Sequence, residues 1–286
     1  MEIVIKYAPW GMAYIMMIVG FSLSLTEFNQ IFQKPKSFFI GAISQTFLVP
    51  IVGIVIAYFA PISPVYKAGV ILTTCVPSAV MSNFVTKMLS GNTALSVALT
   101  SVTSLISFIT IPFILSLSLE FFLESEKYLK NVNFIDISLK IFFIATVPVF
   151  VGIFLRSFFY DKVMKFINFF NKSAFFVFLA IILSAVYSDS EKLLIGYKEI
   201  GFVVAILFFA IYFLSLFWLS FFSISNEDQI GIISENTIQN NALAIVVGSV
   251  FFSDISGILL VSAVYAVFQY KVIILYKLYL MRFNKL

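Results

Sequence analysis

The chain has 286 residues, of which 61% are hydrophobic and only 11% are charged, and its mean hydropathy is +1.06. A water-soluble domain of this length could not carry so much apolar surface, so the composition excludes that class and predicts a polytopic membrane protein. Histidine is absent and Cys75 is the only cysteine, which removes the usual general base, a disulfide within the chain and a thiolate metal site.

Apolar runs separated by charged or turn-forming residues predict an all-α protein with nine transmembrane helices. Barrel strands are excluded because the runs lack the alternation of polar and apolar residues that a barrel needs. No linker or low-complexity tract divides the chain, so residues 1–286 are expected to form one transmembrane domain. In chain order the predicted helices cover about residues 8–26, 38–60, 67–90, 93–119, 137–156, 171–188, 199–222, 229–252 and 256–281.

The Lys and Arg residues of the connections predict the orientation in a cell membrane. One side carries mainly basic residues, whereas the lysines on the other side are accompanied by most of the acidic residues. Because cytoplasmic loops carry the excess of positive charge, we expect the C-terminus in the cytoplasm and the N-terminus outside. The basic side holds Lys34, Lys36, Arg156, Lys162, Lys165, Lys172, Lys277, Arg282 and Lys285.

Two of the nine predicted helices contain features that are costly in hydrocarbon. The third has Pro77 near its middle, and the eighth has Glu235 followed by a cluster of amide side chains. Such groups within a membrane indicate a path or a binding site for ions or substrates. The two helices occupy corresponding places in helices 1–4 and 6–9, which predicts an inverted repeat with two broken helices that cross near the midplane.

Hydroxyl and amide groups close to these two helices are candidate partners of Glu235. Ser96 and Thr100 are four residues apart and share one helix face, and Ser82 comes shortly before them. The alternatives are that the hydroxyls bond to their own helix carbonyls, that Gln45 only ties helices together, and that Glu235 lies at a water-filled break without binding an ion.

Three separate motifs resemble the bile acid:sodium symporter family in its nine-helix form, and the resemblance covers most of the chain. The first is Ser82-Asn83 followed by the segment Gly91-Asn92-Thr93-Ala94-Leu95-Ser96-Val97, the second is Glu235-x-x-x-Gln239-Asn240, and the third is Gln45 with Pro50. The resemblance implies a transporter, and not an enzyme, with a panel of the helices at about 8–26, 137–156 and 171–188 that moves against a core of the other six.

The resemblance also implies which residues bind. Two sodium ions and a small organic anion, either bile-acid-like or a short carboxylate, are the expected ligands, with no organic cofactor and no nucleic acid. At positions 78–80 the chain has Ser-Ala-Val where the family usually has Gly-Gly-Thr, so the identity of the anion stays open. The implied residues are Ser82, Asn83, Ser96, Thr100 and Glu235 for the first sodium, Gln45, Glu235, Asn236, Ile238 and Gln239 for the second, and Asn240, Pro77, Ser78 and Val80 for the anion.

Two other functions remain as alternatives. A carrier of the same fold could be coupled to protons, or uncoupled, with Glu235 as its titrating group; a full set of neutral oxygen ligands argues for sodium instead. A membrane enzyme or a sensor would need a catalytic pair or a soluble output domain, and the sequence contains neither.

Overall fold

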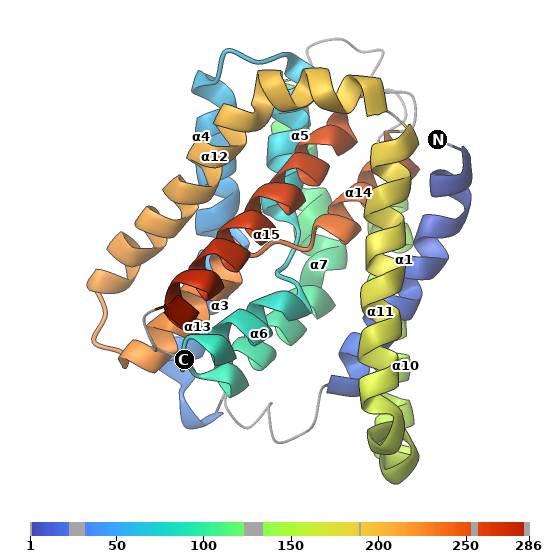
Figure 1. The fold of residues 1–286 in the computed structure, drawn as a ribbon, viewed down its shortest axis with the longest axis vertical. Helices are drawn as coiled ribbons and strands as arrows, with labels where there is room; N and C mark the ends of the chain where they lie inside the picture. Colours follow the sequence, from blue (N-terminus) through green and yellow to red (C-terminus); the bar gives the residue numbers. More distant parts are fainter. Residues whose placement is uncertain (1, 23–31, 123–133, 189, 253–256, 283–286) are drawn as a thin grey trace.

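The described part of the chain is helical. The computed structural model describes residues 2–22, 32–122, 134–188, 190–252 and 257–282 (Figure 1), and within these ranges the chain forms helices and one isolated β-bridge. The elements are α1 (Glu2–Ser22), α3 (Pro35–Ile43), η1 (Ser44–Leu48), α4 (Val49–Phe59), α5 (Pro64–Cys75), α6 (Val80–Met88), α7 (Thr93–Phe122), α9 (Phe134–Ile141), η2 (Phe142–Thr146), α10 (Val147–Phe158), α11 (Tyr160–Ser188), α12 (Ser190–Ser220), α13 (Asn226–Thr237), α14 (Asn241–Phe251) and α15 (Ile258–Arg282).

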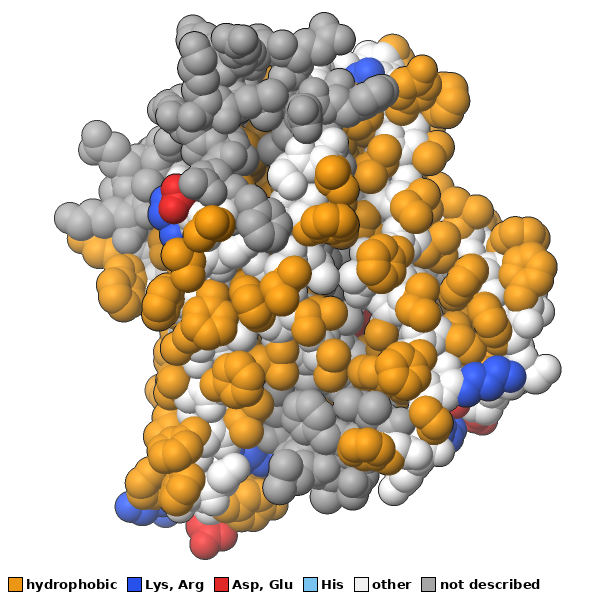
Figure 2. Space-filling model, turned by 180° about the vertical axis from the view of Figure 1, so that it is seen from behind, with side chains coloured by type: hydrophobic (Ala, Val, Ile, Leu, Met, Phe, Trp, Pro, Cys, Tyr) orange, Lys and Arg blue, Asp and Glu red, His pale blue; other side chains and the backbone are white. Residues whose placement is uncertain are grey.

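Six helical segments of the described chain are long and apolar enough to cross a membrane. Hydrophobic side chains cover most of the described surface in Figure 2, and the few charged ones lie around its edges. Such a surface suits lipid and not water. The protein is therefore a multi-pass membrane protein, which confirms the prediction from composition. The six segments are Pro35–Phe59, Thr93–Leu117, Ile135–Phe158, Tyr160–Ile181, Tyr197–Ser220 and Ile258–Leu278.

The remaining three of the nine predicted helices differ from these six. The first corresponds to α1, whose apolar part, Tyr7–Phe21, is shorter, and its predicted end at residue 26 lies outside the described residues. The third and the eighth are each divided into two short helices. Helix α11 begins at Tyr160 and not at 171, so Lys162 and Lys165 are exposed on a helix rather than in a connection. Hydropathy marks where a helix leaves the membrane, but it does not mark where the helix itself begins.

Two prolines widen two of the long helices. Pro50 and Pro148 each follow a π-helical turn, η1 and η2 respectively. A proline ring collides with the carbonyl four residues before it and donates no hydrogen bond, so a wider turn relieves the clash. The first of these turns carries the buried side chains of Ser44 and Gln45.

The two divided helices cross at their interruptions. The chain is extended between α5 and α6 and again between α13 and α14, and Ser78 and Gln239 form an antiparallel β-bridge there. The N–H of Asn240 donates to the carbonyl of Pro77 (2.9 Å), and the N–H of Ala79 donates to the carbonyl of Ile238 (3.4 Å). The crossing therefore places non-helical backbone in the protein interior, where such backbone is tolerated inside a membrane protein.

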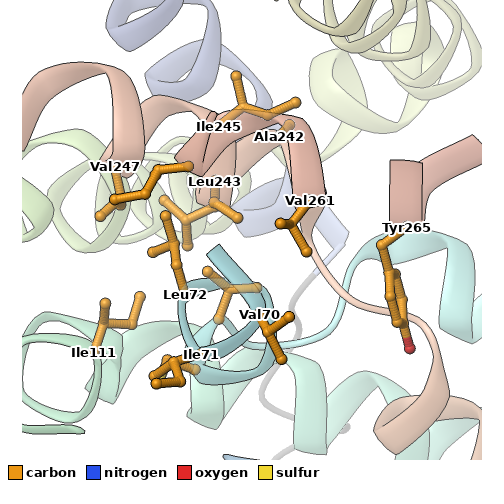
Figure 3. Packing of buried hydrophobic residues seen from close by; sticks show 14 of the residues in the cluster. Val70, Ile71, Leu72, Ile111, Ala242, Leu243, Ile245, Val247, Val261 and Tyr265 are labelled. Carbon is orange, nitrogen blue, oxygen red and sulfur yellow. The ribbon is translucent and has the colours of Figure 1, made fainter. Parts of the chain in front are cut away.

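Helices α1, α10 and α11 lie together on the right of Figure 1, beside the other labelled helices. The contact between α1 and α10 is one of backbone on backbone: a Cβ on Gly152 would lie 2.0 Å from the carbonyl oxygen of Met17. The largest apolar cluster joins α5, α14 and α15, with Leu72, Leu243 and Val261 fully buried (Figure 3). This cluster packs the second half of one divided helix against the first half of the other.

Candidate binding site at the helix crossing

Glu235 lies at the crossing with its side chain 1% exposed. Four hydroxyl groups donate to its carboxylate, two to each oxygen. Ser82 Oγ donates to Oε1 at 2.5 Å and Thr100 Oγ1 donates to Oε2 at 2.7 Å, while the hydroxyls of Ser96 and Ser78 donate to Oε1 and Oε2 respectively. Side chains of α6, α7 and the extended segment thus converge on one carboxylate of α13.

Asn83 completes this group of oxygen atoms. Its Oδ1 lies 2.7 Å from Ser96 Oγ and 3.2 Å from Thr100 Oγ1, so the structure brings together the five residues predicted for the first sodium. Among the described residues, no Lys or Arg side chain forms an ion pair with Glu235. A buried carboxylate is costly unless a positive charge compensates it. The arrangement of oxygen atoms therefore suits a bound cation.

A second group of oxygen atoms lies around Gln45. Gln45 Nε2 donates to Gln239 Oε1 and to the carbonyl of Val76, both at 3.3 Å, and Gln239 Nε2 donates to the carbonyl of Asn236 at 2.6 Å. Gln45 Oε1 is buried and has no hydrogen-bond partner among the described residues. The structure thus brings Gln45, Gln239 and the Asn236 carbonyl together, and the Ile238 carbonyl lies in the adjacent bridge. No hydrogen bond between described residues links Gln45 or Gln239 to Glu235.

A pocket of about 300 Å³ opens beside the crossing. Three of the four residues predicted for the anion, Ser78, Val80 and Asn240, line it, whereas Pro77 lies outside the lining and accepts a backbone hydrogen bond from Asn240. Thr100 also lines the pocket, so Ser78 and Thr100 both border the Glu235 site and the pocket. The apolar wall comes largely from α1 and α11, through Ile15, Met16, Ile18, Val19, Ala174, Phe175 and Phe178.

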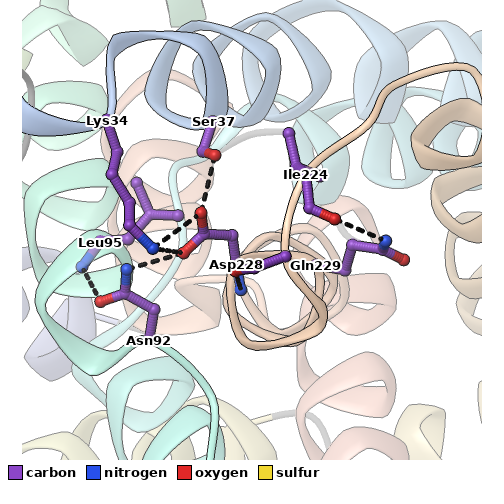
Figure 4. Close-up of polar contacts among 8 residues, drawn as sticks. Lys34, Ser37, Asn92, Leu95, Ile224, Asp228 and Gln229 are labelled. Carbon is purple, nitrogen blue, oxygen red and sulfur yellow. Dashed lines mark hydrogen bonds and ion pairs between the residues drawn. The ribbon is translucent and has the colours of Figure 1, made fainter.

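A second buried carboxylate, Asp228, lies in the first turn of α13 (Figure 4). Lys34 Nζ donates to both of its oxygens at 2.9 and 3.1 Å, Ser37 Oγ donates at 2.8 Å, and Asn92 Nδ2 donates at 2.7 Å. Asp228 therefore has a counter-charge within the protein, Lys34, whereas no described Lys or Arg pairs with Glu235.

Two residues make contacts around the site that the sequence analysis does not predict. Ser78 is predicted beside the anion alone, yet it also donates to Glu235. Asp228 is missing from the predicted site. The pattern Ser225-x-x-Asp228 at the start of α13 is a local signal for it, since Ser225 caps the helix by accepting from the N–H of Asp228 at 3.2 Å. That signal indicates a helix start, but it does not indicate contacts with α3 and α7.

Comparison with known proteins identifies relatives of the chain. The model of the Sodium Bile acid symporter family matches residues 9–196, a range that includes Gln45, Ser82 and Thr100 and ends before Glu235. The "Uncharacterized sodium-dependent transporter YocS" of Bacillus subtilis is 32% identical over 112 residues, which is 39% of this chain and 35% of that protein. The "Probable sodium/metabolite cotransporter BASS3, chloroplastic" of Oryza sativa subsp. japonica is 33% identical over 106 residues, or 37% of this chain and 25% of that protein.

A third relative is the "Ileal sodium/bile acid cotransporter" of Oryctolagus cuniculus, 26% identical over 141 residues, which is 49% of this chain and 40% of that protein. The alignments thus span between a quarter and two fifths of the length of these three relatives. All three are named as transporters, in agreement with the expectation that the protein is not an enzyme. The family model matches well over half of the chain, and the chain therefore belongs to the sodium bile acid symporter family.

Proposed function

We propose that the protein is a sodium-coupled transporter that imports a small organic anion by alternating access. The observation that carries this proposal is Glu235, a buried carboxylate whose side-chain partners among the described residues are all neutral hydroxyl groups. No Lys or Arg of the described residues supplies a positive counter-charge, so we expect a bound cation to supply it, and hard cations prefer such oxygen atoms as ligands. The sodium-coupled names of the relatives support sodium as the cation.

Two ions would bind on the two groups of oxygen atoms. The first ion takes the carboxylate of Glu235, the three hydroxyls of Ser82, Ser96 and Thr100 and the amide oxygen of Asn83. The second ion takes Gln45 and Gln239, the carbonyls of Asn236 and Ile238, and the other side of Glu235. Gln45 Oε1 has no hydrogen-bond partner among the described residues, which supports the second site, because a buried acceptor without a donor is costly and a cation would satisfy it.

The anion would occupy the pocket beside the crossing. No Lys, Arg, Asp or Glu occurs among the described residues that line this pocket, so these residues offer the anion no charged partner. Two sodium ions on one carboxylate leave a net charge of about +1 by simple counting. The anion would neutralise this charge, and the N-termini of α6 and α14 at the crossing would favour it further. The apolar walls favour an anion with an apolar body.

Nine crossings are the proposed topology: the six long segments, α1, and the two divided helices, each pair counted as one crossing. Helix α1 begins at the upper end of Figure 1 and α15 ends at the lower end, which agrees with an odd number of crossings. Helices α1, α9, α10 and α11, with η2, would form the panel and the remaining helices the core. The pocket supports this division, because residues of α1 and α11 face those of the crossing across it.

Uptake of labelled anions into proteoliposomes tests the proposal. A labelled bile salt and a set of labelled short carboxylates are offered with an inward sodium gradient, with an inward proton gradient, or with neither. We expect sodium-driven uptake of at least one anion by the wild type and its loss in Glu235→Gln, which keeps the shape but removes the charge. Glu227→Gln is the matched control, since Glu227 lies on the same helix with an exposed side chain.

Each other outcome has a distinct meaning. Uptake driven by the proton gradient alone would replace this proposal with the proton-coupled carrier. Uptake indifferent to both gradients would indicate an uncoupled carrier. Sodium-driven uptake that survives in Glu235→Gln would place the ion elsewhere in the protein.

A further inference from the structure

Three helices that supply the site start side by side at one end of the protein. Asn92 is the N-cap of α7: its Oδ1 accepts from the N–H of Leu95 at 3.1 Å while its Nδ2 donates to Asp228 of α13 at 2.7 Å. The backbone N–H of Asn92 also donates to the carbonyl of Glu227 at 2.9 Å. On the other side of Asp228, Lys34 and Ser37 hold the start of α3 (Figure 4).

We call these contacts of Asp228 with Asn92, Lys34 and Ser37 the junction. Counted from the junction, the site residues of α7 and α13 lie at matching distances along their helices. Ser96 and Thr100 follow Asn92 by four and eight residues, and Glu235 follows Asp228 by seven. At 1.5 Å per residue these offsets are about 6, 12 and 10.5 Å. With the two starts joined and the helices running in the same direction, the carboxylate of Glu235 falls between the two hydroxyls, and it does accept from both.

Helix α3 is aligned with α13 in the same way. Ser37 contacts Asp228, and seven residues later Ser44 exchanges hydrogen bonds with Asn236, at 3.1 Å to Oδ1 and 3.0 Å from Nδ2. Gln45, whose Nε2 donates to Gln239, is the next residue of the chain. The junction at Asp228 therefore precedes both groups of oxygen atoms by about two helical turns.

The carboxylate of Asp228 is directed at neighbouring helices and not at its own. In a capping box the acidic side chain at this position would bond back to the start of its helix. Here Ser225 provides the cap alone, and among the described residues the Asp228 oxygens accept from Ser37 of α3 and from the residues just before α3 and α7, Lys34 and Asn92. Between this junction and the crossing the helices touch closely, since a Cβ on Gly41 would lie 2.7 Å from Leu99 and 3.0 Å from Ile232.

We infer that Asp228 is a positioning residue for sodium: it sets the register of α3 and α7 against α13 and thereby the spacing of the oxygen atoms in both ion sites. This inference rests on the proposed function, because it concerns the affinity for the transported ion. Residues that orient the ligands of a metal ion change the affinity of the site for that ion without contacting the ion. Asp228 acts from two helical turns away, through a layer of apolar contacts, so its effect is smaller than that of a direct ligand.

The test compares Asp228→Asn with the matched control Glu227→Gln in proteoliposomes and in detergent. Asparagine keeps the shape but loses the charge that holds Lys34. We expect the sodium concentration for half-maximal uptake to rise about three- to tenfold in Asp228→Asn. The KM for the anion at saturating sodium should stay within about twofold of the wild-type value, because the pocket itself is unchanged. Asp228→Glu, which keeps the charge, should recover most of the sodium affinity.

A second readout does not depend on transport. The melting temperature in detergent is measured in NaCl and in choline chloride, and Asp228→Asn should need about three- to tenfold more sodium than Glu227→Gln for the same stabilisation. If Asp228→Asn does not fold, Lys34→Met serves in its place, since Lys34 is 42% exposed, and the same direction of change is expected. The inference about Asp228 would be overturned, with the proposed function intact, if Asp228→Asn required the same sodium concentration as Glu227→Gln. It would also be overturned if Asp228→Asn lost affinity for sodium and for the anion equally. A wild type that ignores sodium in both assays would overturn the proposed function as well.

Discussion

Replacing Thr100 by valine removes one oxygen atom from the proposed first sodium site while it keeps the shape of the side chain. Thr100 Oγ1 lies 2.7 Å from Glu235 Oε2 and 3.2 Å from Asn83 Oδ1, and the side chain is buried. A hydrogen bond to a charged group contributes about 1.5–3 kcal/mol. Because 1.4 kcal/mol corresponds to about a factor of ten in affinity, we expect the sodium affinity of Thr100→Val to fall about 10- to 100-fold.

Thr103→Val is the matched control for this substitution. Thr103 is buried on the same helix, three residues later, but its hydroxyl donates to the carbonyls of Leu99 and Thr100 at 2.8 and 3.3 Å and does not contact Glu235. Sodium-dependent uptake and sodium-dependent melting in detergent are measured for both variants. The reasoning would be refuted if the two variants required the same sodium concentration, because the loss would then come from any buried hydroxyl and not from one at the carboxylate.

Two further predictions concern helix packing and the pocket. Gly152→Ala should destabilise the protein by about 1–3 kcal/mol in thermal melts, because its Cβ would meet the Met17 carbonyl at 2.0 Å. Gly201→Ala is the control, because its Cβ would have its nearest neighbour at 3.7 Å in Tyr197, and its melting temperature should be unchanged or higher. An equal loss of stability in both variants would contradict the close contact at Gly152. Val80→Phe should raise the KM for the anion by about tenfold or more by filling the pocket, with sodium-dependent melting unchanged, and an unaltered KM would place the anion elsewhere.

Much of the architecture could be predicted from local patterns. Long apolar runs indicate membrane helices because each span has to satisfy its own backbone and face lipid, and the multi-pass character and the family are both confirmed. The helix limits were less predictable. The start of α11 at Tyr160 precedes its apolar part, and the π-helical turn before Pro148 depends on how the surrounding helix accommodates the proline. The predicted helix limits rest on hydropathy, and neither feature changes the hydropathy of the sequence.

The sequence by itself determined that Glu235 has partners, because a lone carboxylate in hydrocarbon is too costly, and it indicated the polar residues of α6 and α7 as candidates. Only the tertiary structure decided how they meet. Ser78 and Glu235 are 157 residues apart, and Lys34 and Asp228 are 194 apart. Such pairs depend on helix register, which is set by packing between distant segments and has no local pattern. The position of the carboxylate between two hydroxyls of α7 is therefore a property of the folded chain.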